Sequence, residues 1–200
     1  MSGGVRPGAK RLLLASRSPQ RRAILEQLGV PFVAEPADVE EIEAGEPHAV
    51  AEFNARHKAR AVARPGVIAL GVDTVVALDD RIFGKPRDAL QARATLRRLG
   101  GRTHDVVSGI AVIEDDGRPR TGTAVTKVTF RELDDAWLTW YVGTGEWEGR
   151  AGAYAVQGAG QALVTRIDGE HSNVVGLPVG LLLRLLPGAL PVPRGAGGDP

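Results

Sequence analysis

Side chains that suit phosphate binding gather near the N-terminus, in the segment LLLASRSPQRRAIL, residues 12–25. Ser16 and Ser18 follow a short apolar run, and an amphipathic pattern begins at Pro19, which is the order strand, turn, helix. A helix start presents free N–H groups and the positive end of the helix dipole, and the guanidinium of Arg21 suits phosphate oxygens. The segment therefore predicts a phosphate-binding turn, with an ordinary N-cap at Ser18 as the plainer alternative.

A carboxylate interrupts the long apolar run VIALGVDTVVAL, residues 67–78, where Asp73 stands among β-branched residues. Burying a carboxylate is costly unless it is paired or binds a cation, so Asp73 is a candidate for catalysis or metal binding. The alternative is an aspartate that bonds local N–H groups at a bend. Lys85 follows in a Gly-Lys-Pro turn that lacks the spacing of a P-loop. It is either a phosphate contact close to Asp73 or a solvated lysine.

Further polar residues complete a chemical set. Glu41 belongs to an acidic cluster, residues 38–41, that either offers oxygen ligands to a divalent cation or forms a solvated loop. Gln157 lies among glycines and small residues, where its amide suits a base edge or a turn. Phosphoanhydride hydrolysis requires charge neutralisation, a metal bridge and an oriented water. The residues that supply phosphate donors, carboxylates and a neutral pair for a base are Ser16, Ser18, Arg21, Lys58 and Lys85, then Glu41 and Asp73, then Thr74 and Gln157.

The elements that must position these residues alternate along the chain. Hydrophobic periodicity and β-branched runs predict strands at 11–15, 31–34, 67–78, 103–113, 121–130 and 161–167. Capping residues and helical spacing predict helices at 19–28, 47–63, 134–142 and 178–186, and another between Asp88 and Gly100. The segments left as a turn and a glycine-rich connector are 79–86 and 143–152. This order indicates an α/β fold, a mixed sheet with helices packed against it.

Length and composition set further limits. The 200 residues suit one domain, or two small lobes that share a core, and we expect it to span residues 11–186. Residues 1–10 are expected to form a flexible leader, and the Pro/Gly-rich residues 187–200 a disordered tail. The net charge of +1 and the low aromatic content give no basic stripe for nucleic acid. No apolar stretch approaches the length of a membrane span.

The chain has no cysteine, which removes disulfides and thiolate catalysis and fits a reducing cytoplasm. No zinc-binding spacing is present, because the histidines are scattered at His48, His57, His104 and His171. The lack of a GxSxG segment argues against a serine hydrolase.

The ordered set of short motifs resembles the Maf family of nucleoside triphosphate pyrophosphatases. The resemblance runs from about Leu12 to Leu186 through ASRSPQR (15–21), EE (40–41), KA (58–59), GVDT (71–74), GKP (84–86), GRTH (101–104), AGAYAVQG (151–158) and SNVVGLP (172–178). It implies an elongated mixed sheet flanked by helices, with two lobes around a nucleotide cleft as in ITPases. It also implies a homodimer that hydrolyses the bond between the α and β phosphates, giving a nucleoside monophosphate and pyrophosphate, with Mg²⁺ or Mn²⁺.

The resemblance also implies roles for single residues. Asp73 would be the proton acceptor that activates water, and Glu41 and Asp73 would hold the metal. Lys85 and Glu41 would join Asp73 in catalysis. The residues expected to bind phosphates are Ser16, Ser18, Arg21, Lys58 and Lys85, and those expected to set base specificity are Gln20, Thr74 and Gln157.

One departure concerns the choice of base. Family members that prefer dTTP and UTP carry Arg after the Ser-Pro pair, Thr after the catalytic Asp and Gln in the last glycine-rich motif. This chain carries Thr74 and Gln157 but has Gln20 in place of that Arg, and Arg150 in place of a usual Lys. Two matches of three favour a pyrimidine nucleotide, with modified nucleotides as another expectation. A regulator of cell division that binds nucleotide without hydrolysis is the alternative function.

Overall fold

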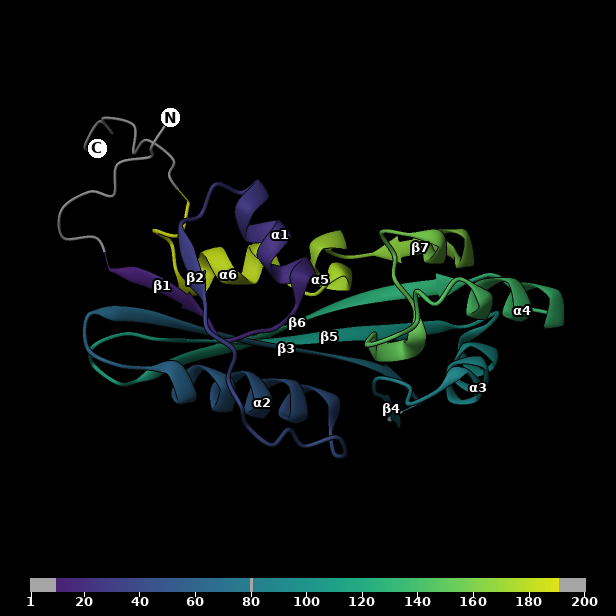
Figure 1. Ribbon diagram of the computed structural model, residues 1–200, viewed down its shortest axis with the longest axis horizontal. Coiled ribbons are helices and arrows are strands. Elements are labelled where there is room, and N and C mark those ends of the chain that lie inside the picture. The colour runs from purple at the N-terminus through teal and green to yellow at the C-terminus, as the bar shows by residue number, and fades with distance from the viewer. Residues whose placement is uncertain (1–9, 80, 191–200) are drawn as a thin grey trace.

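A computed structural model describes residues 10–79 and 81–190. Its centre is one mixed seven-stranded sheet with the order β2-β1-β3-β5-β6-β7, in which β4 also pairs with β3. The molecule is elongated because the longest strands run along it (Figure 1). The strands are β1 (Arg11–Leu14), β2 (Phe32–Ala34), β3 (Val67–Leu78), β4 (Arg81–Phe83), β5 (Thr103–Ile113), β6 (Pro119–Phe130) and β7 (Val164–Asp168). The predicted fold class, a mixed sheet flanked by helices, is confirmed.

Helices cover both faces of the sheet. One face carries α2 alone, and the opposite face carries α1, α5 and α6, while α3 and α4 lie at the far end (Figure 1). The helices are α1 (Pro19–Gln27), α2 (Pro47–Val62), α3 (Ala89–Leu99), α4 (Asp135–Gly143), α5 (His171–Val175) and α6 (Val179–Leu185), with short 3₁₀ turns η1 (Ala151–Ala153) and η2 (Ala159–Leu163). Within the described residues, no helix combines the length and apolarity needed to cross a membrane.

One edge of β3 is interrupted. β1 pairs with Val67–Leu70 in parallel, and β4 pairs with Val76–Leu78 antiparallel on the same edge. Among the described strands, none pairs with residues 71–75 on that edge, whereas β5 covers the other edge throughout. The interruption lies beyond the carboxyl end of β1, a position where open α/β sheets commonly bind ligands.

Helix α2 lies unusually close to the sheet because small residues face each other. A Cβ added to Gly71 would stand 2.0 Å from the carbonyl oxygen of Ala55, and one added to Gly109 would stand 2.3 Å from that of Ala51. The two glycines therefore let the helix backbone rest directly on β3 and β5. This contact brings Lys58, one turn after Ala55, within reach of the middle of β3.

The apolar core divides into two main clusters. One joins β1, α1 and α6 around side chains such as Leu14, Leu25 and Leu182. The other joins α3, α4 and the two 3₁₀ turns around side chains such as Leu96 and Tyr141. The clusters correspond to the two expected lobes, and the interrupted edge of β3 lies between them.

The predictions from the sequence were wrong for several short elements. Residues 79–86, expected as a turn, contain β4, because Phe83 is buried and pairs with Val76. The strand expected at 161–167 begins only at Val164, because the glycine-rich segment before it closes into η2. The short helix α5 was not anticipated, since one turn of helix leaves little periodicity.

The predicted domain ends fall near the limits of the described chain. Lys10, the last residue of the expected leader, forms an ion pair with Asp115 at 2.9 Å, and residues 1–9 lie outside the described residues. At the other end Ala189 is buried in the same core cluster as Leu182. The packed core thus extends past Leu186, the expected domain end, and residues 191–200 lie outside the described residues.

Candidate active site

A cavity of about 710 Å³ opens at the interrupted edge of β3, between the two lobes. All of the residues expected at the site line this one cavity: Ser16, Ser18, Gln20, Arg21, Glu41, Lys58, Asp73, Thr74, Lys85 and Gln157. They come from the start of α1, the loop before α2, α2 itself, β3, the loop after β4 and the loop between η1 and η2. Segments far apart in the sequence therefore meet at a single place.

The turn before α1 has the geometry of a helix start that also faces the cavity. Ser18 is the N-cap residue, and its hydroxyl accepts a hydrogen bond from the backbone N–H of Arg21 at 3.4 Å. Ser16 Oγ accepts from the backbone N–H of Ser18 at 3.2 Å and from Nη1 of Arg21 at 3.1 Å. The capping and the phosphate-binding interpretations of this turn are thus compatible.

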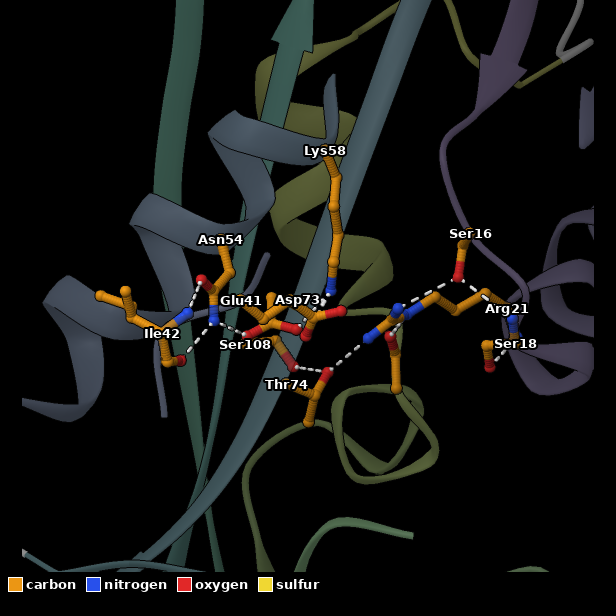
Figure 2. Close-up of polar contacts among 11 residues, drawn as sticks. Ser16, Ser18, Arg21, Glu41, Ile42, Asn54, Lys58, Asp73, Thr74 and Ser108 are labelled. Atoms are coloured by element: carbon orange, nitrogen blue, oxygen red, sulfur yellow. Dashed lines mark hydrogen bonds and ion pairs between the residues drawn. The ribbon is translucent and has the colours of Figure 1, made fainter. Parts of the chain in front are cut away.

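Arg21 is a half-buried cation that connects three elements (Figure 2). Its Nε donates to the carbonyl oxygen of Gly176 at 2.9 Å, and its Nη2 donates to Thr74 Oγ1 at 3.1 Å. Burial lowers the pKa of Arg21, while the nearby charges of Asp73 and Glu41 act in the opposite direction. A guanidinium stays charged at neutral pH, so the cavity wall holds a fixed positive charge.

Asp73 is buried and paired on both carboxylate oxygens (Figure 2). Lys58 Nζ lies 2.7 Å from Oδ1, and Asn54 Nδ2 donates to Oδ2 at 3.0 Å. Burial by itself would raise the pKa of Asp73, but Lys58, Arg21 and Asn54 outweigh it and the pKa is lowered. Asp73 is therefore ionised at neutral pH.

Lys58 lines the cavity and makes contacts that the sequence did not predict. Its ammonium, expected at a phosphate, lies between two carboxylates, 2.7 Å from Asp73 Oδ1 and 3.0 Å from Glu41 Oε2. An ammonium has three N–H donors; one donates to Asp73, while Glu41 forms an ion pair with the same charge, so donor capacity remains. This pairing could not be predicted from the sequence, because the three residues come from a loop, a helix and a strand.

Neighbouring residues of β3 face opposite sides of the sheet. Asp73 faces α2, whereas Thr74 faces α1, where its Oγ1 contacts Arg21 and lies 2.8 Å from Ser108 Oγ. Both reach the cavity because the edge of β3 is open between them. The cavity therefore has an acidic side toward α2 and a cationic, hydroxyl-rich side toward α1.

The opposite wall carries Lys85 and Gln157, both exposed. Among the described residues no ion pair joins Lys85 to Asp73, although the two share the cavity. Glu146, which the sequence did not single out, fastens this wall by accepting the backbone N–H groups of Ala159 and Gly160 at 2.8 and 3.1 Å. The loop that bears Gln157 is thus anchored on its C-terminal side.

The donor set fits a divalent cation that arrives with phosphate oxygens. Glu41 and Asp73 approach each other closely enough to share one ammonium. Among the described residues no group of three or more His, Asp or Glu side chains is arranged to hold a metal. Mg²⁺ commonly uses one or two carboxylates together with substrate phosphates and water, and Glu41 and Asp73 match that pattern.

Comparison with known proteins gave consistent results. The family model described as Maf-like protein matches residues 11–189. A dTTP/UTP pyrophosphatase from Exiguobacterium sibiricum is 47% identical over 178 residues, which cover 88% of this chain and 90% of that protein. A dTTP/UTP pyrophosphatase from Myxococcus xanthus is 48% identical over 188 residues, covering 91% of this chain and 94% of that protein.

Among solved structures, a nucleoside-triphosphatase (dITP/XTP pyrophosphatase) from Mycobacterium abscessus aligns with a TM-score of 0.45 and 18% identity. The alignment covers 88% of this chain and 95% of that one.

Proposed function

The chain belongs to the Maf-like protein family, and on that premise we propose that it is a nucleoside triphosphate pyrophosphatase acting on dTTP or UTP. The reaction would hydrolyse the anhydride between the α and β phosphates and release a nucleoside monophosphate and pyrophosphate. The observation that carries this proposal is an ionised carboxylate, Asp73, in the wall of a cavity that also holds the half-buried guanidinium of Arg21 and a helix start.

The triphosphate would lie along the cationic side of the cavity. Ser16, Ser18 and Arg21 would donate to its oxygens at the start of α1, and Lys85 would reach them from the opposite wall. A remaining donor of Lys58 would face the same phosphates, while its positive charge neutralises Glu41 and Asp73. Without that neutralisation the two carboxylates would repel the incoming anion.

Asp73 would act as the proton acceptor. It takes a proton from a water molecule, the water oxygen forms a bond to one phosphorus of the α–β anhydride, and the bridging P–O bond breaks. A divalent cation held by Glu41 and Asp73 would supply charge neutralisation and fix the phosphates when bound. Arg21 and Lys85 stabilise the negative charge that develops on the separating phosphates.

Base selection would involve Gln20, Thr74 and Gln157. Thr74 holds Arg21, and Gln20 Oε1 accepts from Ser18 Oγ at 3.1 Å, so both are connected to the phosphate turn. We propose a pyrimidine nucleotide, with modified nucleotides as the second substrate class to test. Gln20→Arg is expected to shift the relative kcat/KM further toward dTTP and UTP, and an unchanged ranking would show that Gln20 does not select the base.

We also propose that the protein is a homodimer that acts in the cytoplasm, where its substrates are used, with no nucleic acid or membrane as partner. Its role would be either removal of unwanted nucleotides or control of cell division. Light scattering after size-exclusion chromatography tests the dimer.

The test of the reaction is a panel of canonical and modified triphosphates, each with Mg²⁺ or Mn²⁺, with pyrophosphate and monophosphate measured. Asp73→Asn is expected to lower kcat at least ~10²-fold, as for a lost general base. Asp105→Asn, an exposed carboxylate paired with Lys127, is the matched control. Nucleotide binding without pyrophosphate release would favour the regulator instead.

A further inference from the structure

The side chain of Asn54 joins three separate parts of the site (Figure 2). It extends from α2, one turn before Lys58, and is only 2% exposed. Its Oδ1 accepts from the backbone N–H of Ile42 at 3.0 Å, and its Nδ2 donates to the carbonyl oxygen of Ile42 at 2.9 Å. The second N–H of the same Nδ2 donates to Asp73 Oδ2 at 3.0 Å.

These contacts determine the orientation of the amide. A side-chain amide has two N–H donors and one carbonyl oxygen, and all three are engaged here. Turning the amide over would place its oxygen against the oxygens of Ile42 and Asp73, so only one orientation satisfies the site. The buried side chain of Asn54 thus has a hydrogen-bond partner for each N–H group and for its oxygen, and it links the loop before α2 to β3.

The loop before α2 has few other contacts that would fix its backbone near Ile42. Residues 35–46 form no strand or helix, and the side chain of Ile42 is 41% exposed, so its burial does not hold the loop. The paired hydrogen bonds to Asn54 fix the backbone of Ile42, and Glu41 is the preceding residue. The carboxylate of Glu41 is thereby held 3.0 Å from Lys58 Nζ.

We propose that Asn54 is a positioning residue for the proposed hydrolysis, which sets the carboxylates of Glu41 and Asp73 in one fixed arrangement around Lys58. The inference rests on the proposed function for its catalytic consequence. Of the expected phosphate contacts, Ser16, Arg21 and Lys85 lie on other elements, and the hydrogen bonds of Asn54 go to Ile42 and Asp73. Lys58 is linked to Asn54 through the carboxylate of Asp73. Loss of the amide is therefore expected to disturb the carboxylates while the phosphate contacts on α1 and after β4 stay in place.

Two substitutions test the proposal. Asn54→Leu removes all three hydrogen bonds at similar volume, and Asn54→Asp keeps the shape but loses both N–H donations. Each is expected to lower kcat for dTTP at least ~10-fold, because small displacements of catalytic groups are costly. For Asn54→Leu the Kd for α,β-imido-dUTP, measured by calorimetry, is expected to stay within about 3-fold of wild type, consistent with a loss confined to the chemical step.

The control is Val62→Ala, which loosens the packing at the other end of α2 without touching the carboxylates. It is expected to lower Tm while leaving kcat unchanged. An activity-independent readout is hydrogen exchange of residues 36–45, which Asn54→Leu is expected to accelerate at least ~10-fold relative to Val62→Ala, as for a locally released segment.

Wild-type kcat in Asn54→Leu, or unchanged exchange of residues 36–45, would overturn the inference. Parallel changes in kcat and Kd of Asn54→Leu would also overturn it, because they indicate a general loss of structure. If wild-type protein releases no pyrophosphate, the proposed function fails, and the exchange measurement alone decides whether Asn54 holds the loop.

Discussion

Lys58→Met is expected to destabilise the protein strongly at neutral pH. The substitution keeps an unbranched side chain one heavy atom shorter but removes the ammonium that lies between Asp73 and Glu41. Breaking a buried ion pair by removing one partner costs about 3–5 kcal/mol. For a protein of this size that corresponds to a fall in Tm of about 6–20 °C.

The loss depends on pH in a direction that follows from the pKa of Asp73. In the wild-type protein that pKa is lowered, so the pair contributes stability above the ordinary carboxyl pKa and loses it as the pH falls through the lowered value. In Lys58→Met both effects of Lys58 are lost while burial, the largest single cause, remains, so the pKa of Asp73 is expected to rise. The variant is then destabilised as the pH rises above about 4.

Differential scanning calorimetry of wild type and variant between about pH 4 and pH 7 measures this difference. The Tm gap is expected to widen as the pH rises. Lys127→Met is the matched control, since Lys127 forms an exposed pair with Asp105 that contributes little. A Tm gap of the same size at every pH would refute the argument, because it would show that the loss does not come from the charge of Asp73.

Three further predictions concern other parts of the structure. Gly71→Ala is expected to cost about 3 kcal/mol or more in urea denaturation, because the new methyl meets the backbone of Ala55, whereas Gly143→Ala, which meets nothing, is expected to cost little. Burial lowers the pKa of His104 to about 4, so stability is expected to fall by about 3 kcal/mol as the pH drops from about 6.5 to 4, and His104→Gln is expected to flatten that slope. Lys85→Ala is expected to raise KM for the triphosphate about 10-fold or more, as for a lost charged hydrogen bond, and a wild-type KM would remove Lys85 from the phosphate contacts.

The long elements could be predicted from the sequence because their patterns are strong. The β-branched run around Asp73 extends over the whole of β3, and Pro47 marks the start of α2. The short elements β4 and α5 could not be predicted, because three to five residues give no usable period. Their positions depend on tertiary contacts such as the burial of Phe83.

The membership of the cavity could be predicted, but its internal contacts could not. The ordered motifs predicted that Ser16, Asp73 and Gln157 belong to one site, and all three line the same cavity. The pairing of Lys58 with two carboxylates depends on the close approach of α2 to β3, which is a three-dimensional property. Asn54 carried one local signal, its position one helical turn before Lys58, but its partner Ile42 lies in a loop without periodicity.

The interrupted edge of β3 also bears on resistance to aggregation. Free N–H and C=O groups on a strand edge are templates for pairing with another chain. Here the free stretch, residues 71–75, is short and is closed at both ends by β1 and β4. A foreign strand has too little backbone to pair with, whereas Asp73 and Thr74 still line the cavity at this edge. The fold thus places a ligand cavity at a central strand without exposing a length of strand edge on which another protein could add a strand.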